Sequence, residues 1–354
     1  MVAEKENPSP PIVSMAKRAV RTTALLLCTA SLLIAGWLAV YAFSPGPRAA
    51  EKSAIVNIAR GTPLKQMSAV LAGAGLVKED LRFAILAKIL GYSGRIKAGE
   101  FKLTTGNTPL ALLAQLIRAQ PVQHAVTIPE GLRIEEIGSI FARGGWCDEE
   151  GFRRLAYDKG FMAGLELGKL NSLEGYLFPD TYLLTRDIHG EEELIRLMTR
   201  RFKEVWAEVA TEPGNAERRH EVVILASIIE KEAQKDHERS VIAGVFHNRL
   251  KKGMRLQSDP TVIYGVPDYA GNITRKHLQT PTRYNTYTLD GLPAGPISNP
   301  GRAALAAALK PAATDYLFFV GKNDGSHQFS RTLEEHNQAV QKYQRKKPEK
   351  NGKG

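Results

Sequence analysis

Cysteine is nearly absent from this chain of 354 residues, and several kinds of functional site are absent as well. The two cysteines are Cys28, inside a long apolar stretch, and Cys147, far beyond it, so they cannot pair within one molecule and no disulfide framework is predicted. The histidines, cysteines and aspartates form no cluster at metal-ligand spacing, and there is neither a glycine-rich phosphate loop nor a Gly-x-Ser-x-Gly turn. The sequence therefore does not support a metallohydrolase, a kinase or a serine hydrolase, and it predicts no metal and no cofactor.

The body of the chain also lacks an excess of charge, although the formal net charge of the whole chain is +11. Residues 1–50 contribute +3 and residues 342–354 contribute +5, so only +3 is spread over the long segment between them. A nucleic-acid interface requires basic residues gathered on one surface. Nucleic acid is therefore not expected as a partner, and residues 342–354 are expected to form a basic, solvated, disordered tail.

A stretch without any charge runs from Thr22 to Phe43 and predicts a single transmembrane helix. Its 22 residues match the roughly 20 needed to cross the hydrocarbon core, and Trp37 and Tyr41 lie near its far end, where interfacial aromatic residues are common. Three cations before it, from Lys17 to Arg21, predict that residues 1–21 are cytoplasmic. A cleaved signal peptide is the alternative, although its apolar region is usually only about 7 to 15 residues long. Residues 44–53 are predicted to be a linker, with the rest of the chain outside the cytoplasmic membrane.

Beyond the linker, one short pattern occurs three times. Gly61, Gly106 and Gly131 are each followed by apolar residues at helical spacing, which predicts three units of strand, glycine turn and amphipathic helix. Further helices are expected around residues 134–141 and 191–210. Another is expected to begin at Asn299, with the asparagine as N-cap and Pro300 at the first helical position.

The sequence is organised around a predicted helix from Glu221 to Lys235, which contains an apolar run that ends in two carboxylates, Glu230 and Glu232. With Val222 at 0°, helical periodicity of about 100° per residue places Glu230 near 80° and Glu232 near 280°, on opposite borders of the apolar face. Ser227 is expected on the wet side. A carboxyl group beside aliphatic side chains has its charged form disfavoured, which is what a general acid requires. Carboxylates paired with nearby basic residues are the simpler interpretation of the same pattern.

This apolar run, Leu225 to Glu232, resembles a motif of the YceG-like (MltG) family of membrane-anchored endolytic murein transglycosylases. The segments Gly253–Gly265 and Tyr284–Tyr287 also resemble motifs of that family, as does Glu174–Tyr182. The four motifs occur in the family's order, and the resemblance covers nearly everything after the first 50 residues.

The resemblance implies an α+β fold in which a transmembrane helix is followed by a small LysM-like α/β module at residues 54–125 and a transglycosylase domain at residues 126–341. Within the module, Arg95–Leu103 resembles the family's LysM-like segment, and glycan binding or a spacer role are both open for it. The resemblance assigns the catalytic acid/base role to Glu230. Substrate binding is expected of Gln257, Asp259, Tyr264, Tyr284, Asn285 and Tyr176. For Tyr176, stacking on a sugar ring and packing in the core are both open.

The implied activity is lytic cleavage of peptidoglycan between N-acetylmuramic acid and N-acetylglucosamine, with formation of 1,6-anhydro ends. A muramidase that hydrolyses the same bond with Asp259 as a second carboxylate is one alternative. A non-catalytic, membrane-anchored glycan-binding scaffold is the other. The expected partners are glycan strands, lipid around the transmembrane helix and, as candidates, cell-wall synthesis proteins. The expected location is the inner (cytoplasmic) membrane, with the catalytic part on its outer, periplasmic side.

Overall fold

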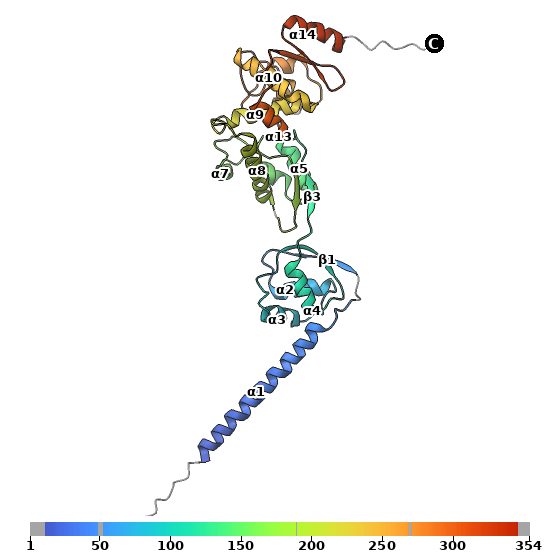
Figure 1. Ribbon diagram of the computed structural model, residues 1–354, viewed down its shortest axis with the longest axis vertical. Coiled ribbons are helices and arrows are strands. Elements are labelled where there is room, and N and C mark those ends of the chain that lie inside the picture. Colours follow the sequence, from blue (N-terminus) through green and yellow to red (C-terminus); the bar gives the residue numbers. More distant parts are fainter. Residues whose placement is uncertain (1–10, 49–51, 189, 268, 270, 346–354) are drawn as a thin grey trace, which may run out of the picture. The chain divides into compact units, whose positions relative to one another are not determined.

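The computed structural model describes residues 11–48, 52–188, 190–267, 269 and 271–345. Residues 1–10 of the expected cytoplasmic tail and residues 346–354 of the expected basic tail lie outside this range. The chain divides into two compact units (Figure 1). Unit 1 contains residues 1–124 and 185–187, and unit 2 contains residues 125–184 and 188–354.

Unit 1 begins with a long helix, α1, from Pro11 to Phe43. Within it, Met15–Phe43 is long and apolar enough to span a membrane, and among the described residues no other helix is. The last turns of α1 pack on the rest of the unit, since Leu38, Tyr41 and Ala42 are buried there. The guanidinium of Arg82 lies over the ring of Tyr41, 4.4 Å from its centroid.

The remainder of unit 1 is a two-stranded antiparallel sheet with three helices. In the sheet, Val56 of one strand lies opposite Phe101 of the other. The elements are β1 (Ser53–Ile58), α2 (Leu64–Gly73), α3 (Arg82–Ile89), β2 (Gly99–Thr104) and α4 (Pro109–Arg118). Phe83, Phe101 and Leu113 are completely buried in a core that is separate from the core of unit 2.

Unit 2 is mostly helical and contains two more small sheets, in which β3 pairs with β4 and β5 pairs with β6. Its first elements are β3 (His124–Thr127), α5 (Ile134–Arg143), α6 (Glu149–Ala156), α7 (Lys159–Ala163), β4 (Thr181–Leu184), α8 (Gly190–Val209) and α9 (Arg219–Glu232). They are followed by η1 (Asp236–Glu238), α10 (Arg239–Lys251), α11 (Asp259–Gly265), α12 (Arg275–Gln279), α13 (Arg302–Leu309), β5 (Phe318–Gly321), β6 (His327–Ser330), α14 (Leu333–Val340) and a π-helical turn η2 (Gln341–Arg345). The chain is therefore a mixed α+β protein, as predicted.

The threefold pattern of strand, glycine and helix is confirmed. Gly61 lies between β1 and α2, Gly106 between β2 and α4, and Gly131 between β3 and α5. All three glycines have φ between 77° and 80°, a left-handed conformation that residues with a Cβ rarely adopt. The expected helices at 134–141 and 191–210 are α5 and α8.

Helix α9 is the central helix of unit 2 and packs against α10, α11 and α13. It is buried on all sides from Val222 to Ile229, so the expected wet face is wrong for Ser227. The Ser227 hydroxyl donates to the Ile224 carbonyl and accepts the Ile297 N–H, which satisfies it inside the core. The helix also ends at Glu232, three residues earlier than expected, because Ala233 is extended.

Candidate active site

The two carboxylates at the end of α9 point into different surroundings. Glu232 lines a cavity of about 450 Å³, and Glu230 does not. The other polar lining residues are Gln257, Asp259, Tyr287, Arg249, His327, His336 and Gln344. Apolar lining comes from Phe318 and Phe319 on β5 and from Leu333 and Val340 on α14. The volume and the mixed lining are those of a ligand site.

Glu232 is held in this cavity by the segment that precedes α11. Its Oε1 accepts a hydrogen bond of 2.5 Å from the hydroxyl of Ser258, the residue just before that helix. Burial raises the pKa of the Glu232 carboxyl above its usual value; the Ser258 hydrogen bond opposes this, and the charge of Asp259 adds to it. The result is a carboxyl group that retains its proton more readily than a free glutamate, at a cavity wall where it can donate that proton.

Asp259 and Arg249 are each fixed within the same cavity. Asp259 accepts a hydrogen bond of 2.6 Å from the Tyr287 hydroxyl. Arg249 donates to the carbonyls of Leu317 (2.6 Å) and Leu256 (2.8 Å), so it joins α10 to the segments on both sides of the cavity. Burial lowers the pKa of Arg249. The cavity therefore contains two acids and one cation in fixed positions.

Glu230 lies on another side of α9, against two loops. Its Oε2 accepts from the Gly301 N–H (3.0 Å), and its Oε1 accepts from the Arg239 guanidinium (3.4 Å). The same guanidinium lies 3.9 Å from the carboxylate of Glu130, whose pKa is raised by burial and by the charge of Glu230. The Glu130 carboxylate fills the space that a side chain at position 301 would need. Glu230 therefore belongs to an ionic cluster that ties the loops at 130–131 and 299–301 to α9.

The structure brings only part of the predicted substrate set together. Gln257 and Asp259 lie in the cavity with Glu232. Tyr264 and Tyr284 lie edge to face, 4.7 Å between centroids, in a different cluster around Glu174. Asn285 is completely buried, and its amide donates to three carbonyls of the α12 region, those of His277, Leu278 and Thr280. Its expected substrate contact stays a prediction that this burial disfavours.

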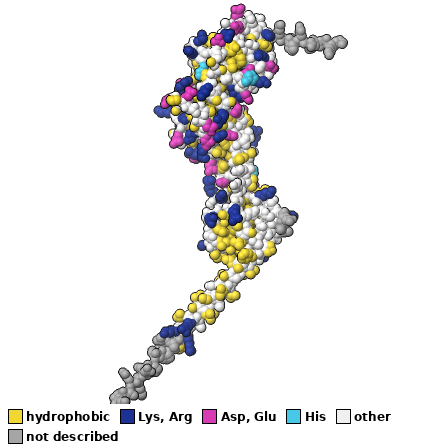
Figure 2. All heavy atoms as spheres, in the orientation of Figure 1, with side chains coloured by type: hydrophobic (Ala, Val, Ile, Leu, Met, Phe, Trp, Pro, Cys, Tyr) yellow, Lys and Arg dark blue, Asp and Glu magenta, His cyan; other side chains and the backbone are white. Residues whose placement is uncertain are grey.

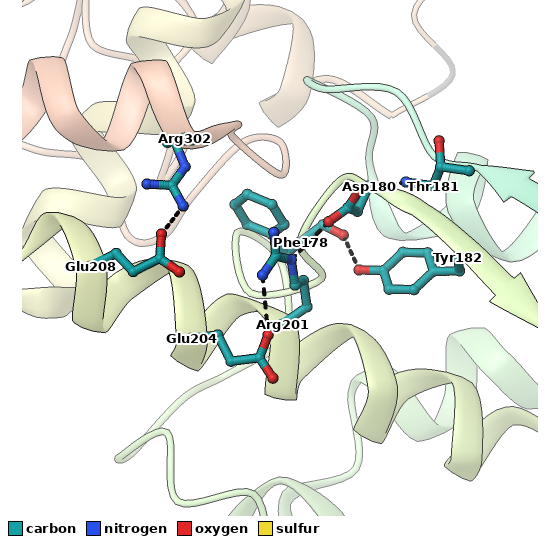
Figure 3. A network of polar contacts seen from close by, with 8 residues as sticks. All are labelled: Phe178, Asp180, Thr181, Tyr182, Arg201, Glu204, Glu208 and Arg302. Atoms are coloured by element: carbon teal, nitrogen blue, oxygen red, sulfur yellow. Dashed lines mark hydrogen bonds and ion pairs between the residues drawn. The ribbon is translucent and has the colours of Figure 1, made fainter.

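The segment Glu174–Tyr182 is built into the core rather than presented to solvent. Tyr176 is completely buried, packs on Phe202 and bonds to His220, which favours the packing interpretation over stacking on sugar. Figure 3 shows how the rest of the segment is held: Arg201 of α8 binds Asp180 (2.7 Å) and Glu204. The Tyr182 hydroxyl donates to the Phe178 carbonyl in the same view.

Glu174 is a buried acid to which the sequence prediction gave no role. It accepts from the Asn299 amide (2.7 Å) and the Tyr264 hydroxyl (3.1 Å), and burial raises its pKa to about 8. Asn299 also accepts the Gly131 N–H on its carbonyl, so it joins Glu174 to the loops beside Glu230. The expected N-cap role of Asn299 is wrong, since α13 begins at Arg302 after Gly301. In the sequence, the one feature that could have indicated a role for Glu174 was its position as an acid at the start of the aromatic motif Glu174–Tyr182.

These features define a class of protein: a mixed α+β chain with an N-terminal apolar helix, in which a buried helix ends in a carboxyl group that opens onto a polar cavity. The chain belongs to the YceG-like family, whose family model matches residues 56–342.

Individual relatives agree with this. An endolytic murein transglycosylase of Bacillus subtilis is 32% identical over 313 residues, which cover 83% of this chain and 86% of that protein. One from Streptococcus pneumoniae serotype 2 is 27% identical over 326 residues, but these cover only 58% of the pneumococcal protein and 82% of this chain. A crystal structure of a YceG-like protein from Listeria monocytogenes matches with a TM-score of 0.55 and 30% identity, over 82% of this chain and 99% of the Listeria chain.

Proposed function

We propose that this protein is an endolytic murein transglycosylase, which cleaves peptidoglycan within its glycan strands between N-acetylmuramic acid and N-acetylglucosamine. The observation that carries the proposal is Glu232, a carboxyl group with a raised pKa on a polar cavity of about 450 Å³, in a member of the YceG-like family. The names of the Bacillus and Streptococcus relatives support the same activity.

In the proposed reaction Glu232 first acts as an acid. It donates its proton to the glycosidic oxygen, and the bond between that oxygen and the anomeric carbon of N-acetylmuramic acid breaks through an oxocarbenium-like state. The Glu232 carboxylate then accepts the proton of the 6-hydroxyl of the same sugar, whose oxygen bonds to the anomeric carbon. The product is a 1,6-anhydro ring, and no water is consumed.

Glu230 is the alternative acid, because the family resemblance pointed to it. Its two oxygens are occupied by the Gly301 N–H and the Arg239 guanidinium, and it does not line the cavity. A carboxylate held in this way is better suited to positioning loops than to donating a proton. We therefore favour Glu232 as the acid/base and assign to Glu230 the role of fixing the loops at 130–131 and 299–301.

Hydrolysis of the same bond is a second candidate, because Asp259 lines the same cavity as Glu232. A second carboxylate can activate water or form a covalent intermediate, and a hydrolase normally uses two. In that reaction the product would have a reducing end instead of an anhydro end. A non-catalytic envelope scaffold would give neither product.

The membrane anchor, the side of the membrane and the role of the module in unit 1 belong to the same proposal. Helix α1 would anchor the chain in the cytoplasmic membrane, because Met15–Phe43 is long and apolar enough to span it. The part of unit 1 that follows α1, together with unit 2, would then lie on the outer side, where glycan strands are. Unit 1, with its two-stranded sheet and three helices, is the part in which LysM-like glycan binding is to be tested.

The decisive experiment is mass analysis of purified peptidoglycan after digestion with the full chain in detergent. Anhydro products, lighter than reducing products by one water, are expected. Reducing products would favour the muramidase, and the absence of products from a folded protein would favour the scaffold.

A pair of matched variants then identifies the acid. Glu232→Gln keeps the side-chain volume but cannot deliver a proton, so turnover should fall by about 10² to 10⁴. Glu230→Gln, two residues away on the same helix, should retain more of the activity and lose stability through its weakened pairing with Arg239. The reverse result, with Glu230→Gln inactive and Glu232→Gln active, would return the catalytic role to Glu230.

A further inference from the structure

Helix α3 of unit 1 has apolar side chains on two sides, which is unusual for a helix on the surface of a small unit. One side is buried, with Phe83, Leu86 and Ala87 in the core. The other side carries Ile85 and Ile89 and is continued by the N-cap residue Leu81; the exposed fractions of Leu81, Ile85 and Ile89 are 56%, 42% and 66%. These three residues are four apart, so they form one continuous stripe along the helix.

The stripe continues into an apolar groove between α3 and α1. The groove has a volume of about 510 Å³. Its α3 side is formed by Leu86, Ile89 and Leu90, and its α1 side includes Leu38 and Phe43. Nearly all of the lining is hydrocarbon. Figure 2 shows hydrophobic side chains gathered on unit 1 next to the end of α1.

The level of the stripe along α1 is fixed by contacts within unit 1. The Arg82 guanidinium, on the first residue of α3, lies 5.4 Å from the ring centroid of Trp37 and 4.4 Å from that of Tyr41. Aromatic residues near the end of a span mark the boundary between hydrocarbon and headgroups. The stripe therefore begins at the boundary region and runs alongside the last turns of α1.

We propose that α3 is a membrane-surface helix, with Leu81, Ile85 and Ile89 inserted among the lipids of the outer leaflet and an acyl chain in the groove between α3 and α1. The proposal rests on α1 spanning the membrane, because the groove is continuous with the surface of that helix. Lipid is the occupant that fits, since the lining offers hydrocarbon and almost no polar partner for a peptide backbone. The part of unit 1 that follows α1 would then lie on the membrane surface.

The position of the stripe can be measured by lipid quenching. The full chain, with Cys28 and Cys147 replaced by alanine, receives a single cysteine at Ile89 and an environment-sensitive fluorophore. It is reconstituted in vesicles of phosphatidylethanolamine and phosphatidylglycerol that carry a quencher at a shallow acyl position. The matched control is Ile55→Cys in β1 of the same unit, where the exposed fraction is 64% against 66% for Ile89. Figure 1 shows β1 on the side of unit 1 that is far from α1, whereas α3 lies close to the end of α1.

The expected result is quenching at position 89 that is several-fold stronger than at position 55, with emission shifted to the blue. Equal quenching at the two positions would overturn the proposal. If the signal at 89 depends on protein density and is lost at about one chain per vesicle, a second copy occupies the groove and the assignment to lipid is overturned.

A fluorophore on the native Cys28, with Cys147 replaced by alanine, tests separately whether α1 spans the membrane. Quenching of this label by a deep acyl quencher indicates that α1 spans the membrane. If position 89 is then not quenched, only the membrane-surface helix is overturned. Absence of quenching at Cys28 would overturn the span and the helix proposal together. Neither outcome bears on the cleavage assay, which uses the full chain in detergent and reports on the proposed activity independently.

Discussion

Replacing Glu174 with glutamine should change how the stability of unit 2 depends on pH. Burial raises the pKa of Glu174 to about 8, from an ordinary value of 4.5, with the charge of Glu135 as the next cause. Between these two pH values the folded chain holds a proton that the unfolded chain has released. The free energy of unfolding therefore falls as pH rises through this interval, and the full contribution is present only below the ordinary value.

The size of the effect follows from the same two pKa values. Each pH unit inside the interval is worth about 1.4 kcal/mol, so the parent chain should lose up to about 3 kcal/mol between pH 5 and pH 7 through Glu174. Glutamine stays neutral over this range, and its carbonyl oxygen can still accept the Asn299 amide that now binds Glu174. The stability of Glu174→Gln relative to the parent chain should thus rise by about the same amount.

Urea unfolding at several pH values measures this difference. Of the three tryptophans, Trp146 and Trp206 lie in unit 2, so a Trp37→Phe background makes the fluorescence report on that unit alone. Glu221→Gln is a suitable control, because the Glu221 side chain is 65% exposed and its removal should give little pH-dependent change. A constant difference between Glu174→Gln and the parent chain from pH 5 to pH 8 would refute the reasoning, since it would mean that Glu174 is ionised in the folded protein.

Three further substitutions test the contacts of unit 2. Asn285→Ala removes an amide that donates to three carbonyls. It should destabilise the fold by about 2–4 kcal/mol in urea unfolding, while the folded fraction retains cleavage. Lost cleavage at unchanged stability would instead support the predicted contact of Asn285 with substrate. Gly175→Ala should lower the melting temperature far more than Gly214→Ala. The two glycines have nearly the same φ, 87° and 86°, but only a Cβ at position 175 would overlap valine and proline side chains, at 2.6–2.7 Å. Equal losses in melting temperature would contradict this. Tyr287→Phe removes the 2.6 Å hydrogen bond that fixes Asp259 at the cavity wall, and it should slow cleavage several-fold with a stability loss of only about 1 kcal/mol. An unchanged rate would show that cleavage does not need Asp259 to be held in this position.

The features that the sequence determined are local ones. The uncharged stretch from Thr22 predicted a membrane-spanning helix, and among the described residues one helix is long and apolar enough to span, the one that contains this stretch. The sequence was sufficient here because hydropathy over about 20 residues does not depend on the rest of the fold. The glycines at 61, 106 and 131 marked three helix starts because a left-handed turn needs glycine wherever it occurs. Membership of the YceG-like family, inferred from four short motifs, is likewise confirmed by a family model that matches residues 56–342.

Tertiary packing decided how the side chains of those motifs are used. A helical wheel treats Glu230 and Glu232 as equivalent, because both border one apolar face. Burial by segments distant in sequence raises the pKa of Glu232, and the cavity beside α14 gives this carboxyl group an opening. Glu230 is instead bound by the Gly301 N–H and the Arg239 guanidinium. Cavities and burial arise from segments far apart in the sequence, and local periodicity carries no information about which segments those are.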